Sequence, residues 1–163
     1  MGLTKGTTIS WKSSGGTYAI APTSLADQAA WEGDKGDLLD GTYGLPAFLE
    51  CFVTSSVATT VASDGKEIQW FFSQSANATA GDDNPGGLTG ASSSRGATLR
   101  YQLTYAGQLP FLTGLTTGIQ RAQFTFYPKT RYAIPYVFNN SGKTLGSTAG
   151  DHTLTVTPYF WVP

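Results

Sequence analysis

The stretch "KEIQWFFS", residues 66–73, decides how the rest of the chain is interpreted. Ile68, Trp70 and Phe72 alternate with Glu67 and Gln69, so an extended backbone would carry apolar side chains on one face and polar ones on the other. A period of two residues is the pattern of a half-buried β-strand. We therefore predict a strand that directs Ile68, Trp70 and Phe72 into a core.

Phe71 does not follow this alternation. It falls on the polar face of the predicted strand, where a large aromatic ring is stable only if something covers it. Phe71 is therefore a candidate contact with a partner or with a sugar ring.

Similar runs recur from residue 45 onward, separated by short turn segments rich in Gly, Pro, Asn and Ser. This spacing predicts an all-β, antiparallel β-sandwich with very little helix. Pro135 has no N–H to donate, so its strand is expected at a sheet edge or at a bulge. The other predicted strands are 45–54, 58–62, 98–105, 121–128, 131–140 and 152–160.

The beginning of the chain has a different composition. Residues 1–16 are rich in Gly, Thr and Ser, with Ile9 and Trp11 isolated among them, which predicts a flexible N-terminal arm before a single sandwich domain at 17–163. Trp11 and Trp161 lie near the two ends of the chain, where they would either tuck back or dock on another subunit. Ser24 could cap one or two helical turns.

Charge and cysteine content exclude several classes of function. The net charge is −1, only 13% of residues are charged, and the basic residues are scattered, so we expect neither nucleic acid nor a membrane as partner. No apolar segment approaches the length of a spanning helix or of a signal peptide core. Cys51 is the only cysteine and is expected to be a small buried residue.

Oxygen-rich segments are candidate cation sites. "AGDDNPGG", residues 80–87, offers Asp82, Asp83 and Asn84 within a long polar stretch, residues 73–97, that predicts a surface excursion. "DKGDLLDG", residues 34–41, carries an aspartate at every third position. Neither has the spacing of an EF-hand loop, and such residues are common turn formers, so no metal or cofactor is predicted.

Catalytic patterns are weak. His152 is the sole histidine, and no G-x-S-x-G nucleophile elbow accompanies it. Glu50 and Glu67 are the only carboxylate pair that merits consideration for a glycosidase. We expect no catalytic residues, and hence no enzyme.

Three segments resemble small virion proteins of tailed bacteriophages and prophages. In that group a strand of the type V-x-L-Y-L-x-x-S-x-D enters a polar loop, a Pro-containing strand ends in N-x-S/T-G, and the chain closes on N-T-L-x-L-x-P-Y. The matching positions here are Ile68, Trp70, Phe72 and Ser75; Tyr132, Val137, Asn139, Asn140, Ser141 and Gly142; and His152, Thr153, Leu154, Val156, Pro158 and Tyr159.

The resemblance implies a jelly-roll sandwich on the capsid surface of a virion, acting as a decoration or cement protein on the major capsid protein. It also implies a homo-oligomer, with a trimer favoured. The residue pattern itself predicts Ile9, Trp11, Phe71 and Trp161 as the partner contacts in such a role. The alternative is a carbohydrate-binding or host-receptor-binding module, which outward aromatic residues and the 73–97 loop would serve. A calcium-stabilised sandwich enzyme is a third hypothesis.

Overall fold

The protein is all-β, as predicted. The computed structural model describes residues 1–59, 66–79, 83–111 and 118–163, and within them helix is limited to three short 3-10 turns: η1 (Pro85–Gly87), η2 (Ala97–Gln102) and η3 (Ala149–Asp151). The strands are β1 (Gly2–Lys5), β2 (Ile9–Lys12), β3 (Tyr18–Ala19), β4 (Ala30–Glu32), β5 (Gly36–Asp37), β6 (Phe48–Ser55), β7 (Lys66–Ser75), β8 (Ser93–Arg95), β9 (Thr104–Phe111), β10 (Gln120–Phe126), β11 (Tyr132–Asn140) and β12 (Thr153–Val162).

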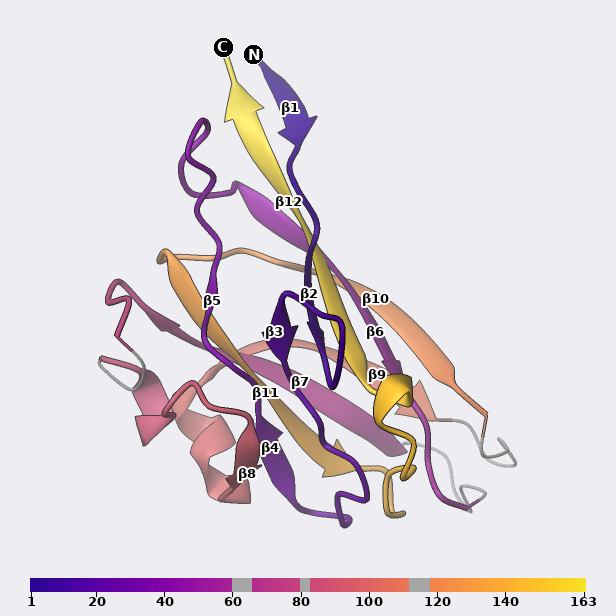
Figure 1. The fold of residues 1–163 in the computed structure, drawn as a ribbon. Helices are drawn as coiled ribbons and strands as arrows, with labels where there is room; N and C mark the ends of the chain where they lie inside the picture. The colour runs from indigo at the N-terminus through magenta and orange to yellow at the C-terminus, as the bar shows by residue number, and fades with distance from the viewer. Residues whose placement is uncertain (60–65, 80–82, 112–117) are drawn as a thin grey trace.

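Two six-stranded sheets face each other as a sandwich (Figure 1). Sheet A has the order β10-β6-β12-β2-β3, with β1 paired to β12, and sheet B has the order β8-β4-β11-β7-β9, with β5 paired to β11. All pairings are antiparallel except that of β2 with β3. The chain crosses repeatedly between sheets, so neighbouring strands are often distant in sequence.

The main core lies between the sheets and is built by the expected alternation. Ile68, Trp70 and Phe72 of β7 are all 1% exposed or less, and they face Leu49 and Cys51 of β6 across the sandwich core. Inward residues of β11 and β12 complete the same cluster. The prediction that Cys51 is a small buried residue is confirmed, and no other cysteine is available to pair with it.

The N-terminal segment is part of the sandwich and does not form a free arm. β2 pairs with β12, and Trp11 is fully buried in the main core, with its Nε1 donating to the Asp34 carbonyl at 2.8 Å. Its ring packs against Gly36, where any Cβ would collide with it. Ile9 is half-buried against the same core. Of the two alternatives for Trp11, tucking back onto the domain or docking on another subunit, the structure shows the first, because the pairing of β2 with β12 carries the ring into the main core.

Of the two expectations for Pro135, an edge strand or a bulge, the edge is wrong. The register shifts by one residue opposite Pro135, since Tyr136 pairs with Glu32 whereas Ala133 pairs with Gly36. β11 is an interior strand, paired with β7 on one side and with β4 and β5 on the other. Pro135 lies in the gap between β4 and β5, and its carbonyl accepts a hydrogen bond of 2.8 Å from Gly33 N on that side. The N atom of a residue in a strand points to the same side as its carbonyl, so the missing N–H faces the gap and breaks no ladder bond.

From residue 83 onward, the polar segment that follows β7 in the sequence folds back over sheet B instead of extending into solvent. Leu88 is fully buried, and it joins Phe71, Ala30, Ile134, Tyr136 and Phe138 in a second small core on the outer face of this sheet. Phe71 does point away from the main core, as the alternation requires, but it is only 7% exposed. We call residues 83–103 the cover segment.

Residues 98–105, predicted as one strand, form η2 and only the start of β9. Leu99 and Leu103 pack from this segment onto the second core. One other expectation differs from the structure, and one falls mostly outside the described residues. The segment after Ser24 is not helical, since Ser24 and Gln28 have φ of 52° and 62°. The predicted strand at 58–62 lies outside the described residues from 60 onward.

A buried carboxylate fastens the cover segment to β4. Glu32 is fully buried, and its Oε1 accepts hydrogen bonds from Arg95 Nη2 and Thr89 Oγ1, both at 2.6 Å, and from Ser93 Oγ at 3.3 Å. Its Oε2 accepts from Thr89 N at 3.1 Å. Because both oxygens are used, the charge is compensated where it is shielded from water.

Candidate functional site

The most distinctive exposed feature is a two-stranded extension at the chain ends. β12 pairs with β6 as far as Tyr159 and Phe48, and from Phe160 to Val162 it pairs with β1 alone. Figure 1 shows this ribbon projecting beyond the body of the sandwich, with both termini at its tip. We call Gly2–Lys5 together with Tyr159–Val162 the terminal ribbon.

The two faces of the terminal ribbon differ. Phe160 is 1% exposed and its ring lies 5.4 Å from that of Tyr43, so this face is turned toward the protein. Alternation turns Trp161 to the opposite face, where it is 60% exposed, and its direct cross-strand partner is Leu3, 47% exposed. Two large apolar side chains are thus placed side by side in solvent.

More aromatic residues gather where the terminal ribbon joins the sandwich. Phe48 stacks on Tyr159 with ring centroids 4.8 Å apart, and Tyr127 lies 6.3 Å from Phe48 while remaining 67% exposed. Tyr159 and Phe48 are direct cross-strand partners on β12 and β6. The arrangement offers a partner protein apolar and aromatic contacts on a rigid sheet.

The four predicted contact residues are not brought together. Trp161 is exposed on the terminal ribbon, whereas Trp11 and Ile9 belong to the main core and Phe71 to the second core. Trp11 is therefore closed to a partner, and Phe71 reaches the surface only as part of the lining of a groove on sheet B. Leu3 was not singled out in the sequence, because a lone leucine in a Gly/Thr-rich stretch carries no pattern. Only its pairing with Trp161 reveals it.

The three aspartates at residues 34–41 serve separate structural purposes. Asp34 accepts from Ala19 N and Ser92 N, at 3.0 and 2.9 Å, and Asp37 forms an ion pair of 2.8 Å with Arg131. Asp40 caps the following turn by accepting from Thr42 N at 2.8 Å. Within the described ranges no three carboxylate, His or Cys groups form a metal cluster, and Asp82 lies outside those ranges.

His152 is buried next to Ser55, and their side chains are 1% and 3% exposed. Nε2 lies 2.9 Å from the Gly146 carbonyl, which can only accept, so Nε2 carries the proton and Nδ1 accepts from Ser55 Oγ at 2.6 Å. Burial lowers the pKa of His152 below its ordinary value. The pair is closed to solvent and links the end of β6 to the residue that precedes β12.

The candidate glycosidase carboxylates lie on different sheets. Glu50 is on the outer face of β6 in sheet A and accepts from Gln123 Nε2 at 2.6 Å. Glu67 is on the outer face of β7 in sheet B and accepts from Gln69 Nε2. The sandwich core separates these two faces, so the two carboxylates cannot flank one glycosidic bond.

Comparison with known proteins adds no relationship. No family model matches the sequence, and no curated protein resembles it at a significant level. The part of the chain that the structure describes contains no helix with the length and apolar character needed to cross a bilayer.

Proposed function

We propose that this protein is a structural component of a phage virion, a decoration or cement protein that attaches to the major capsid protein on the outer capsid surface. The observation that carries the proposal is the terminal ribbon, which presents Leu3 and Trp161 side by side in solvent at the projecting end of the sandwich. The motif positions that resemble virion proteins fall on β7, on β11 and the turn after it, and on β12 with His152 before it. A sandwich of jelly-roll type is part of the same proposal.

Attachment through the terminal ribbon has a physical basis. Burying a large apolar side chain contributes roughly 1.5 to 3 kcal/mol, so docking of Trp161 and Leu3 supplies several kcal/mol toward binding. The outer edge of β1 has no strand partner among the described residues. Its free N–H and C=O groups can pair with an extended segment of a coat subunit, which adds direction to the apolar contact.

The low charge of the protein suits such a role. With a net charge of −1, it experiences little long-range repulsion when many copies are arranged on one surface. We also propose a homo-oligomer, most simply a trimer that matches a local three-fold position of a capsid, with the virion as its location. Light scattering of the purified protein at several concentrations measures that oligomeric state directly.

The test is binding to capsid shells that lack the protein. Trp161→Ala and Leu3→Asp should each weaken co-sedimentation with shells at least tenfold, since each removes a contact worth about 1.4 kcal/mol or more. The control is Tyr105→Ala, which truncates a half-exposed aromatic residue of sheet B. Unchanged binding of both ribbon variants would refute attachment through the ribbon, and absence of shell binding by the wild-type protein would refute the proposed function.

A further inference from the structure

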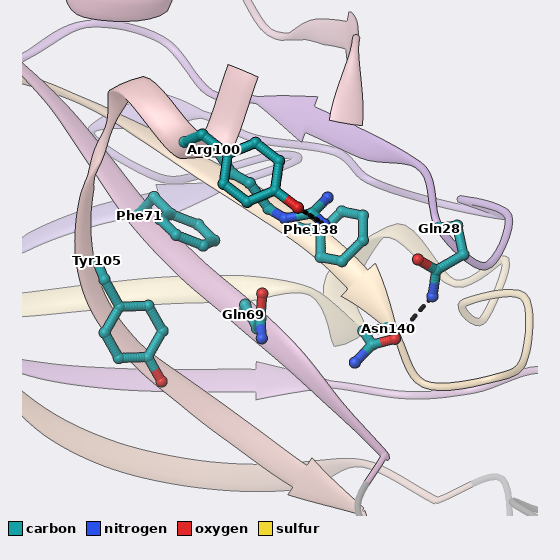
Figure 2. Close-up of a pocket in the computed structure, with 8 residues that line it drawn as sticks. Gln28, Gln69, Phe71, Arg100, Tyr105, Phe138 and Asn140 are labelled. Atoms are coloured by element: carbon teal, nitrogen blue, oxygen red, sulfur yellow. Dashed lines mark hydrogen bonds between the residues drawn. The ribbon is translucent and has the colours of Figure 1, made fainter. Parts of the chain in front are cut away.

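The outer face of sheet B is covered only in part. The cover segment hides Tyr136 and Ile134, but the neighbouring positions toward the other end of β7 and β11 remain open and carry Gln69 and Asn140. A groove of about 390 Å³ lies at this boundary, with η2 as one wall and the sheet as its floor (Figure 2). Its volume is in the range of ordinary small-ligand sites.

One end of the groove holds Arg100, a cation with no carboxylate partner among the described residues. The Arg100 guanidinium lies 3.9 Å from the centre of the Phe138 ring and 4.6 Å from that of Tyr101, and it donates to the Ala97 carbonyl at 3.0 Å and the Tyr101 hydroxyl at 2.9 Å. The ion pairs found within the described residues involve Arg95 and Arg131 instead. Arg100 is therefore held rigidly, with N–H donors left for an anionic ligand.

The other end of the groove carries paired amides. Gln28 Nε2 donates to Asn140 Oδ1 at 2.7 Å, which fixes both side chains (Figure 2). Gln28 Oε1 remains as an acceptor and Asn140 Nδ2 as a donor, and the two atoms point away from each other on either side of this bond. Gln69 lies on the floor between this pair and Phe71. The pair therefore offers one acceptor and one donor to hydroxyl groups of a sugar that lies along the groove.

Aromatic faces complete the lining. Tyr101 is 76% exposed, and Tyr105 is 50% exposed with its ring edge-on to Phe71 at 5.4 Å. Exposed, positioned aromatic rings bind the C–H faces of sugars, and a guanidinium binds a carboxylate in two parallel hydrogen bonds. We propose that this groove binds an acidic oligosaccharide, with the sugar carboxylate at Arg100, a ring on Tyr101 and the hydroxyls on Gln28 and Asn140.

This site is independent of the proposed attachment function. The groove lies on sheet B, whereas the terminal ribbon belongs to sheet A. A protein fixed to a particle through the ribbon therefore still has the groove available for glycans. Loss of one activity with retention of the other distinguishes the two proposals.

The test uses the full-length protein and calorimetric or NMR titration with 3′-sialyllactose, digalacturonic acid and neutral lactose. Saturable binding of at least one acidic sugar is expected, about tenfold tighter than that of lactose, and weakened by added salt. Tyr101→Ala and Arg100→Gln should each reduce affinity about tenfold. Tyr127→Ala should leave the affinity unchanged, since Tyr127 is 67% exposed, lies against Phe48 of sheet A and does not line the groove.

Fold retention is checked by thermal melting, because Arg100 also packs on Phe138. If Arg100→Gln unfolds, Tyr101→Ala alone tests the proposal, because the Tyr101 ring is mostly in solvent and its removal should leave the fold intact. Absence of saturable binding by both acidic sugars, equal affinity for lactose, or an unchanged affinity in Tyr101→Ala would each overturn the proposal.

Discussion

Replacing Trp11 with Ala should destabilise the protein severely, although the residue lies in a segment whose composition is typical of a linker. Truncating a fully buried Trp costs about 3 to 5 kcal/mol in lost burial and cavity formation. The Asp34 carbonyl, which accepts from Trp11 Nε1, also loses its partner at a further cost of about 1 kcal/mol or more. The sum, about 4 to 6 kcal/mol, is comparable to the whole stability of an ordinary domain, about 5 to 15 kcal/mol.

The assay is urea unfolding followed by far-ultraviolet circular dichroism, because tryptophan fluorescence changes with the substitution itself. Trp161→Ala is the matched control, and its ring is 60% exposed, so its loss in unfolding free energy should stay below about 1 kcal/mol. Both variants replace Trp with Ala, so the difference between their unfolding free energies reports the effect of burial alone. A Trp11→Ala protein that unfolds within about 1 kcal/mol of wild type would refute the placement of the N-terminal segment in the core.

Three further predictions follow from buried groups. Glu32→Gln should lower the free energy of unfolding in urea by roughly 2 to 4 kcal/mol, because it leaves Arg95 without its carboxylate partner. A variant as stable as the wild-type protein would contradict that ion pair. The pKa of His152 is lowered in the folded state, so its contribution to the free energy of unfolding is constant above about pH 6.5 and falls as the pH drops below it, because the unfolded state then takes up the proton first. Urea unfolding at several pH values from 7.5 to 5 checks this. The pH dependence of the unfolding free energy should disappear in His152→Gln. Burial and the Glu50 charge raise the pKa of the Cys51 thiol, so Ellman's reagent should react with it only in denaturant, and rapid reaction of the native protein would disprove its burial.

The alternation of residue types predicted the strands that have two unlike faces. β7, β10 and β12 each carry apolar residues at every second position because one face meets the core and the other meets solvent or a neighbour. The pattern failed at residues 98–105, where Leu99 and Leu103 are four apart. That spacing fits both a strand and a helical turn, and only the second core beneath these residues selects the turn.

The sequence pattern could not predict contacts between residues that are far apart in the chain. β2 is four residues long and pairs with a strand at the other end of the chain, so nothing local marks Trp11 as a core residue. The cover segment likewise contributes only Leu88 as a large buried side chain before η2, and a stretch with so few apolar residues has the composition of a surface loop. Its attachment depends on Glu32, whose partners lie 57 to 63 residues away.

The groove on sheet B was missed for a related reason. Arg100, Gln28 and Asn140 come from three distant parts of the chain, and the motif that contains Asn140 gives no indication of the other two. Phe71 was correctly predicted to point away from the main core, but no residue pattern indicated that another segment would cover it. Candidate sites made of single residues from several strands become visible only when the register of the sheet is known.

The proposed virion role is tested most directly by density-gradient sedimentation of particles from the cells that produce the protein, with each fraction analysed by mass spectrometry. The account predicts peptides of this chain in the fast-sedimenting fractions, in a fixed ratio to the major capsid protein across the particle peak. Recovery of the chain solely in the slow fractions of free protein, with none on the particles, would contradict it.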